Sequence, residues 1–224
     1  MVGLGTWEYN NSVAYKATLT ALKVGYVHVD TATMYGNHAG VGQAIQDWQS
    51  QNGGRREDIF VTTKIPGGLN YSAAEAALEA SLKDLGLDYV DLMLVHFPAY
   101  WDGMGSAGPE ATDDREFDHM VGTLYQSFSP LCGPCGTSEL INGKLVTEIG
   151  KKYGKSGAQV SLKWQVQQGI PVIPKSDEAS HIIANAQLFD WELSIEDMIK
   201  LDAAKSPPVT GGGDSKTSGD CKIP

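Results

Sequence analysis

The sequence has few cysteines and no long apolar run, and each shortage excludes a class of protein. Its three cysteines are too few for a disulfide framework, which favours a reducing compartment. No stretch approaches the roughly 20 apolar residues of a membrane span. The N-terminus, MVGLGTWEYNN, has neither the basic region nor the apolar core of a secretory signal. We therefore expect a cytoplasmic protein; an organelle stays open, because the chain starts abruptly inside an apolar run.

Positive charge is also scarce in this chain. Lysine and arginine together number 17 against 27 aspartates and glutamates, which gives a formal net charge of −10 at pH 7. Such an acidic surface argues against nucleic acid or an anionic membrane as the main partner. The 224 residues, 42% of them hydrophobic, are typical of a globular protein with one domain or one and a half.

The sequence does contain a regular alternation of short apolar runs with helical patterns. This alternation predicts a parallel sheet built from βα units, and the nearly all-apolar run at 89–97 is typical of a strand buried on both faces. The predicted strands are 2–7, 26–30, 58–65, 89–97, 126–131 and 171–175. The predicted helices are 12–24, 41–49, 72–85, 138–153, 157–168, 180–187 and 194–204.

Six βα units that run the same way favour a TIM-type (β/α)8 barrel, here incomplete. Only 31 residues separate His96 from Phe128, whereas two further units need roughly 60 at about 30 residues each. We therefore predict a barrel over residues 1–205 with an irregular junction at 99–124. The polar, Pro/Gly-rich residues 206–224 are predicted to form a flexible tail.

Four polar side chains fall at the carboxyl ends of predicted strands, where barrel enzymes carry their chemistry. Asp30, Lys64 and His96 end three successive strands, and Tyr35 follows Asp30 in a loop. A lysine ammonium should lower the pKa of a tyrosine from about 10, with the aspartate orienting the lysine. The phenol could then protonate an oxyanion, with the histidine as a second donor. Taken singly, each has an ordinary alternative as a cap, a solvated strand end, a core histidine or a turn residue.

Six motifs in order carry a resemblance to a known family. They are GLGTW, HVDTATMYGN, VTTKI, DYVDLMLVHFP, SPL and IPKS, and together they cover about residues 2–98 and 125–204. In this respect the chain resembles the aldo-keto reductases, which are (β/α)8 barrels that reduce aldehydes and ketones with NAD(P)H and without a metal. The resemblance implies a catalytic tetrad of Asp30, Tyr35, Lys64 and His96.

The resemblance also implies a substrate pocket and a cofactor site. Trp7 and Phe97 would wall the substrate pocket. In the cofactor site an aromatic ring would stack on the nicotinamide, small residues would touch the pyrophosphate and ribose, and polar residues would hold the 2′-phosphate and adenine. The cofactor-binding residues implied are Thr6, Phe128, Ser129, Leu131, Lys175, Ser176, His181 and Asn185.

Some positions depart from the family pattern. His181 stands where the family often has an arginine for the 2′-phosphate, and Asp177 and Glu178 weaken the positive field, so we expect NADP with NAD possible. In the family, a Ser-Asn pair and a glutamine hold the nicotinamide carboxamide, and these residues have no counterpart in this sequence. The family's N-terminal hairpin has no counterpart either. We therefore expect weak nicotinamide binding.

Two hypotheses for function follow. The first is NAD(P)H-dependent reduction of aldehydes or ketones to alcohols, with Tyr35 as general acid. The alternative is a catalytically weak or inactive relative that serves as a structural or binding subunit and meets a protein partner at its open sheet edge. Cys132 and Cys135, in CGPC, form either a loop or, as in thioredoxin-like proteins, a redox or metal motif. The substrate and the oligomeric state are not determined by the sequence.

Overall fold

A computed structural model describes residues 2–67, 69, 71–96, 126–127, 129–131 and 137–204, which fall into two compact units. The N-terminal unit contains residues 2–96 together with 175–182, and the C-terminal unit contains the other described residues. The predicted junction at 99–124 and tail at 206–224 lie outside the described residues, so the proposed single domain over 1–205 stays a prediction. In the described part, no helix is both long enough and apolar enough to cross a membrane.

The N-terminal unit is built on a parallel sheet of four strands in the order β1-β2-β3-β4. The strands are β1 (Leu4–Gly5), β2 (His28–Asp30), β3 (Phe60–Ile65) and β4 (Leu92–Val95). Asp30 lies opposite both Gly5 and Thr62, and Lys64 lies opposite Leu94. Because the strands are parallel, this register brings their carboxyl ends to the same end of the sheet, as the sequence predicted.

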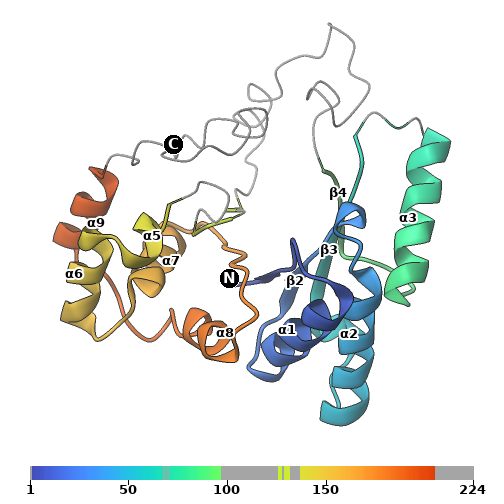
Figure 1. The fold of residues 1–224 in the computed structure, drawn as a ribbon, viewed down its shortest axis with the longest axis horizontal. Helices are drawn as coiled ribbons and strands as arrows, with labels where there is room; N and C mark the ends of the chain where they lie inside the picture. Colours follow the sequence, from blue (N-terminus) through green and yellow to red (C-terminus); the bar gives the residue numbers. More distant parts are fainter. Residues whose placement is uncertain are drawn as a thin grey trace, which may run out of the picture. The chain divides into compact units, whose positions relative to one another are not determined.

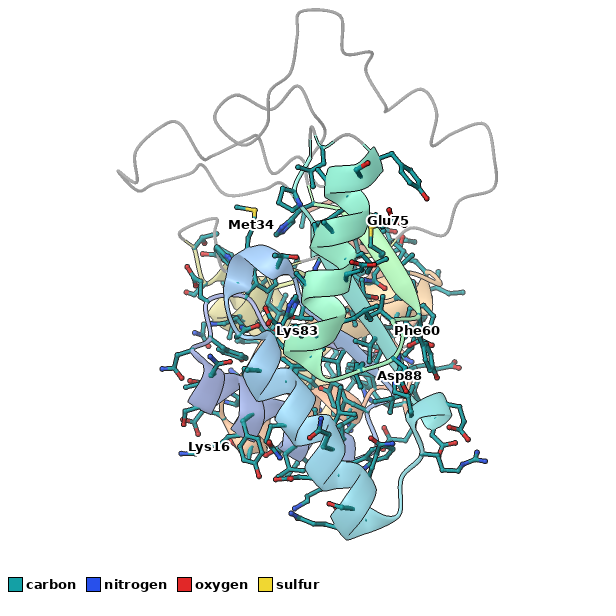
Figure 2. The ribbon with its side chains drawn as sticks, turned by 90° about the vertical axis from the view of Figure 1, so that its right-hand side faces the viewer. Lys16, Met34, Phe60, Glu75, Lys83 and Asp88 are labelled. Carbon is teal, nitrogen blue, oxygen red and sulfur yellow. The ribbon has the colours of Figure 1, made fainter. Side chains whose placement is uncertain are left out.

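A helix follows each of the first three strands. These are α1 (Asn11–Lys23), α2 (His38–Asn52) and α3 (Tyr71–Leu85), and α2 packs between the other two (Figure 1). Figure 2 shows α3 in front of the strands, with Glu75 and Lys83 along its length. Short 3-10 turns, η1 (Thr33–Tyr35) and η2 (Arg56–Asp58), follow β2 and precede β3.

The helix boundaries have local causes. Helix α1 starts at Asn11, rather than at Ser12 as predicted, because Asn10 caps it: the Asn10 side-chain oxygen accepts a hydrogen bond from the Val13 N–H at 2.9 Å. The predicted helix 41–49 is longer at both ends in α2. Two glycines of α2 allow close packing, because a Cβ on Gly40 would collide with the backbone oxygen of Asn11, and one on Gly42 with that of Leu85.

The outermost strand, β4, departs from the sequence prediction. The side chains of Leu92, Met93 and Val95 are 38%, 38% and 59% exposed, so the expectation of a strand buried on both faces is wrong. The physical reason is position: in the described part of the chain β3 is the only strand that pairs with β4, so β4 lies at the edge of the described sheet. Apolar composition alone cannot distinguish an edge strand from a central one.

The C-terminal unit is helical and has its own core. Its helices are α5 (Glu139–Asn142), α6 (Lys144–Tyr153), α7 (Gly157–Gln167) and α9 (Ile195–Asp202), and the division between the units falls within α8 (Ala179–Ala186). The predicted helix 138–153 is split because Gly143 has an extended backbone. The core consists of Val146, Ile149, Val160, Leu193 and Leu201.

The two predicted strands of the C-terminal unit are reduced to one parallel bridge between Ser127 and Val172. Ser127 N–H donates to the Pro171 carbonyl at 2.8 Å, and Ile173 N–H donates to the Ser127 carbonyl at 3.3 Å. Proline has no N–H to donate, and Pro130, Pro171 and Pro174 flank the bridge. A longer ladder is therefore interrupted on both sides.

Candidate active site

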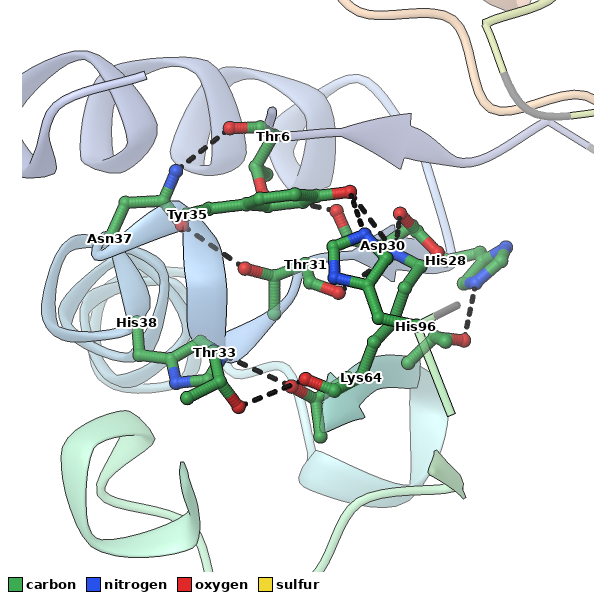
Figure 3. A network of polar contacts seen from close by, with 12 residues as sticks. Thr6, His28, Asp30, Thr31, Thr33, Tyr35, Asn37, His38, Lys64 and His96 are labelled. Atoms are coloured by element: carbon green, nitrogen blue, oxygen red, sulfur yellow. Dashed lines mark hydrogen bonds and ion pairs between the residues drawn. The ribbon is translucent and has the colours of Figure 1, made fainter. Parts of the chain in front are cut away.

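The four side chains expected at the strand ends lie together in the N-terminal unit (Figure 3). Asp30 is the last residue of β2, Lys64 lies near the end of β3, and His96 directly follows β4. Tyr35 ends η1, and its 3-10 turn returns the phenol to the same edge of the sheet. The parallel order of the strands thus assembles groups that are 66 residues apart at most.

Asp30 and Lys64 form a buried ion pair. The Lys64 ammonium lies 2.5 Å from Asp30 Oδ1 and also donates to the Thr31 carbonyl at 2.9 Å. The two side chains are only 12% and 4% exposed, for Lys64 and Asp30 respectively. Burial lowers the pKa of Lys64 and raises that of Asp30, and their mutual attraction opposes both shifts.

The Tyr35 hydroxyl stands between this ion pair and His96. Its oxygen lies 3.5 Å from Lys64 Nζ and 3.5 Å from His96 Nε2. The Tyr35 and His96 rings meet edge to face, with centroids 5.4 Å apart. Both distances are long for strong hydrogen bonds. A carbonyl oxygen near the phenol would be within reach of the imidazole as well.

The acidity of Tyr35 differs from the sequence expectation that Lys64 lowers its pKa. Burial raises the pKa of Tyr35 above its ordinary value of 10, and the nearby Asp30 charge raises it further. The expectation was wrong because burial disfavours the charged phenolate. In addition, Asp30 balances the Lys64 charge at 2.5 Å, so the phenol faces a nearly neutral pair. Tyr35 is therefore fully protonated at neutral pH and suited to give a proton to a strong base such as an alkoxide.

His96 is neutral under the same conditions. Burial, followed by the positive charge of Lys64, lowers its pKa from 6.5 to about 4. A neutral imidazole donates one hydrogen bond and accepts another, so it can orient a carbonyl oxygen without competing as a cationic acid. The site thus contains one phenol and one imidazole, both uncharged, beside a compensated ion pair.

Asn37, which sequence reasoning did not assign to the site, is a buried support of it. Its amide nitrogen donates to the Thr6 carbonyl at 2.7 Å and the Tyr9 carbonyl at 3.1 Å. Its amide oxygen accepts from the Thr31 hydroxyl at 3.1 Å. Asn37 therefore ties the segment after β1 to the residue that follows Asp30 (Figure 3). The signal available in the sequence was its position two residues after Tyr35.

The predicted substrate-pocket residues are only partly described. Trp7 follows β1 and is 40% exposed, and Phe97 lies outside the described residues. Thr6, at the end of the same strand, is buried and donates from its hydroxyl to the Asp30 carbonyl at 3.1 Å. Its hydroxyl thus contacts the backbone of the aspartate directly.

The predicted cofactor residues divide between the two units. Lys175, Ser176 and His181 belong to the N-terminal unit with the four catalytic candidates, even though they follow them by about 80 residues or more. Ser129, Leu131 and Asn185 belong to the C-terminal unit. Ser129 has a left-handed backbone (φ 45°), which a serine adopts rarely. Phe128 and the CGPC motif lie outside the described residues.

Comparison with known proteins gives a consistent result. The model of the aldo/keto reductase family matches residues 1–121 and 110–206. Glyoxal reductase from Bacillus subtilis (strain 168) is 34% identical over 256 aligned positions, which include 93% of this chain and 90% of that protein.

Solved structures agree with this match. An aldo-keto reductase enzyme from a Medee basin deep-sea metagenome library has a TM-score of 0.76 and 30% identity, with 90% of this chain and 89% of that chain covered. The aldo/keto reductase of Brucella melitensis has a TM-score of 0.71 and 31% identity, with 90% and 93% covered. The predicted fold class, an incomplete (β/α)8 barrel, is thereby confirmed.

The comparisons also bear on the gap between His96 and Phe128. The alignment with the Bacillus enzyme has 256 positions, which is more than the 224 residues of this chain. It therefore contains gaps, where the Bacillus enzyme has residues and this chain has none. The two segments of this chain that match the family model overlap at residues 110–121. That overlap lies inside the junction at 99–124, where the sequence predicted that two βα units are missing.

Proposed function

Because this chain belongs to the aldo-keto reductase family, we propose that it reduces aldehydes or ketones to alcohols, with NADPH as hydride donor and Tyr35 as general acid. The observation that carries the proposal is the contact series Asp30–Lys64–Tyr35–His96, which places an uncharged phenol and an uncharged imidazole 3.5 Å apart beside a buried cation. Cytoplasmic location stays a prediction.

Each residue of the site has a separate role at the carbonyl oxygen of the substrate. That oxygen accepts hydrogen bonds from the Tyr35 hydroxyl and the His96 imidazole. As negative charge develops on it, Tyr35 transfers its proton to the oxygen, and the ammonium of Lys64 stabilises the phenolate that remains. Asp30 holds the ammonium in place. The nicotinamide, when bound, supplies the hydride that reaches the carbonyl carbon.

One described residue, Lys175, supports a phosphorylated dinucleotide as the cofactor. Lys175 is exposed, and none of the ion pairs in the described part of the chain engages it. Its ammonium therefore remains available to a phosphate of the cofactor. Asp177 and Glu178 follow within three residues, so the preference for NADPH over NADH is expected to be modest.

The substrate class follows from the same site. Its two donors suit one carbonyl oxygen, and of the predicted substrate-pocket residues only Trp7 is described. Small reactive aldehydes are therefore the first compounds to test, among them glyoxal, which the name of the Bacillus relative indicates as its substrate.

The decisive experiment replaces Tyr35 with phenylalanine. Tyr35→Phe keeps an aromatic ring of almost the same shape and removes the proton, so turnover should fall about 10²–10⁴-fold while cofactor affinity is retained. NADPH oxidation with a reactive aromatic aldehyde measures turnover, and fluorescence titration measures affinity. Lys64→Met should act similarly, because the phenolate then has no cation beside it.

The opposite pattern would identify another acid. If Tyr35→Phe were mild and His96→Ala severe, the histidine would be the proton donor. Wild-type turnover in Tyr35→Phe would leave the shared ancestry without the shared chemistry.

A second candidate function is a binding or structural subunit that has little catalytic activity. The observation in its favour is the exposed edge strand β4, whose apolar side chains at Leu92, Met93 and Val95 would suit a protein partner. A wild-type chain that oxidises NADPH with none of a panel of aldehydes, and that Tyr35→Phe does not change, would favour this candidate over the enzyme.

A further inference from the structure

An aromatic ring lies beneath the lysine assigned to the cofactor phosphate. Lys175 Nζ is 4.6 Å from the centroid of the Tyr9 ring, within the range of a cation–π contact. Tyr9 is 5% exposed, whereas Lys175 is exposed. The two residues are 166 positions apart but belong to the same unit. A buried ring thus holds a solvent-facing charge.

The position of this ring is tied to the candidate active site. Tyr9 N–H donates to the Thr6 carbonyl at 3.3 Å, and the Tyr9 carbonyl accepts from the Asn37 amide at 3.1 Å. Asn37 stands two residues after Tyr35 and is fully buried. The backbone of Tyr9 is therefore held by the same amide that braces the segment after Asp30.

Among the described residues, Lys175 contacts the Tyr9 ring and forms no ion pair with a carboxylate. Asp177 lies near enough that its charge, after burial, contributes to raising the pKa of Tyr9. Even so, neither Asp177 nor Glu178 forms an ion pair with Lys175 among the described residues. A carboxylate would neutralise the ammonium, whereas a ring fixes its position and leaves the positive charge available to an anion.

The Tyr9 hydroxyl takes no part in this arrangement. Its oxygen is buried and has no hydrogen-bond partner among the described residues. The contact with Lys175 therefore depends on the ring face and not on the hydroxyl. A substitution that removes only the hydroxyl should therefore keep the contact, whereas one that removes the ring should abolish it.

We propose that Tyr9 is a positioning residue for cofactor specificity, whose buried ring holds the Lys175 ammonium where it binds the 2′-phosphate of an adenosine ribose. The inference rests on the proposed function, because it takes the cofactor to be a phosphorylated dinucleotide. It adds a residue from the segment after β1 to a phosphate site that is otherwise formed by residues 175–181.

The test compares Tyr9→Phe, which keeps the ring, with Tyr9→Leu, which removes it. The probes are adenosine 2′,5′-bisphosphate and adenosine 5′-monophosphate, titrated calorimetrically against the whole chain without any turnover. Tyr9→Leu should weaken the bisphosphate about 2- to 30-fold, equivalent to the roughly 0.5–2 kcal/mol of a cation–π contact. Affinity for the monophosphate should be unchanged, and Tyr9→Phe should resemble the wild type for both probes.

A Lys175→Met variant separates the two ways of failing. If Lys175→Met abolishes the preference for the bisphosphate and Tyr9→Leu leaves it intact, this inference is overturned while the proposed cofactor stands. If the wild type does not prefer the bisphosphate and Lys175→Met changes nothing, the cofactor proposal fails and the inference with it. Should Tyr9→Leu not fold, Tyr9→Met keeps an apolar side chain without a ring and is held to the same outcomes.

Discussion

The ammonium group of the candidate-site lysine, Lys64, contacts three neighbours. Its Nζ donates to Asp30 and to the Thr31 carbonyl and lies 3.5 Å from the Tyr35 hydroxyl. Because Asp30 balances its charge, the lysine does not make the phenol more acidic in the resting site. Its contribution comes when the phenol has lost its proton and a phenolate faces the ammonium.

The same pair leads to a prediction about stability. Asp30→Asn leaves the Lys64 ammonium buried without its counter-charge, so the free energy of unfolding should fall by about 3–5 kcal/mol. Asp30→Asn combined with Lys64→Met removes both charges and should recover most of that loss. Urea denaturation of the two single variants and the double variant measures the coupling between them.

Turnover should not recover in the double variant, although stability should. The double variant should be as inactive as Lys64→Met alone, because restored folding does not return the cation beside Tyr35. If the double variant were no more stable than Asp30→Asn, the unpaired charge of Lys64 would not be the cause of the lost stability.

At the scale of elements, the arrangement of the N-terminal unit depends on how closely its helices approach. The backbone oxygen of Leu85, at the end of α3, occupies the space that a Cβ on Gly42 would need. Gly40 has the same relation to Asn11 at the start of α1. Two glycines in α2 thus allow both neighbouring helices to pack against it.

Gly42→Ala brings two opposing effects into competition. Alanine favours a helix by about 1 kcal/mol over glycine, but here its methyl group collides with backbone atoms, and overpacking typically costs 1–3 kcal/mol or more. We expect the collision to dominate, because a backbone oxygen cannot rotate away as a side chain could. The free energy of unfolding in urea should therefore fall.

The control for this prediction is a change on the exposed face of the same helix. Gln43→Ala, next in sequence and exposed, alters the helix propensity without entering the interface. It should change the stability little. If Gly42→Ala proved more stable than the wild type, the close approach of α2 and α3 would not hold in solution.

At the scale of the whole molecule, buried histidines make stability depend on pH. His28 is 2% exposed on β2 and lies 3.0 Å from the Thr62 hydroxyl through Nε2. Burial, followed by the Lys64 charge, lowers its pKa from 6.5 to about 4. The pKa values of His38 and His96 are lowered as well, mainly by burial.

The direction of the pH effect follows from proton binding. Between about pH 6.5 and 4 the unfolded chain binds protons that the folded chain does not, so the free energy of unfolding falls as the pH falls through this range. For His28 alone the full loss is about 3 kcal/mol at about 1.4 kcal/mol per pKa unit. Urea denaturation at pH 7 and pH 5 measures the slope.

A variant assigns this slope to one residue. His28→Gln should reduce the difference in stability between pH 7 and pH 5. Val61→Ala, which removes buried apolar volume on the neighbouring strand, should lower the stability at both pH values and leave that difference intact. An unchanged difference in His28→Gln would locate the titration elsewhere.

Local sequence patterns determined much of this protein. Apolar runs alternating with helical patterns predicted the four strands of the sheet, because burial and backbone propensity act over a few residues. Asp30, Lys64 and His96 were placed together from the sequence alone, because the carboxyl ends of parallel strands share one edge. Their roles in catalysis and the weak nicotinamide binding stay predictions.

Other features depend on neighbours that are distant in the sequence. The pKa of Tyr35 rises because folding buries the phenol and places Asp30 against Lys64, whereas the sequence indicated only that a lysine is near. The exposure of β4 is decided by which strand lies beside it, and composition does not encode that.

The contact between Tyr9 and Lys175 joins two segments that are separated by most of the chain. No local pattern could predict it, because neither residue belongs to a motif that includes the other. The sequence by itself determined which chemical groups stand at the strand ends. Only the tertiary structure decided their charge states, their burial and the ring that holds Lys175, because electrostatic fields and burial are set by everything that folding brings close.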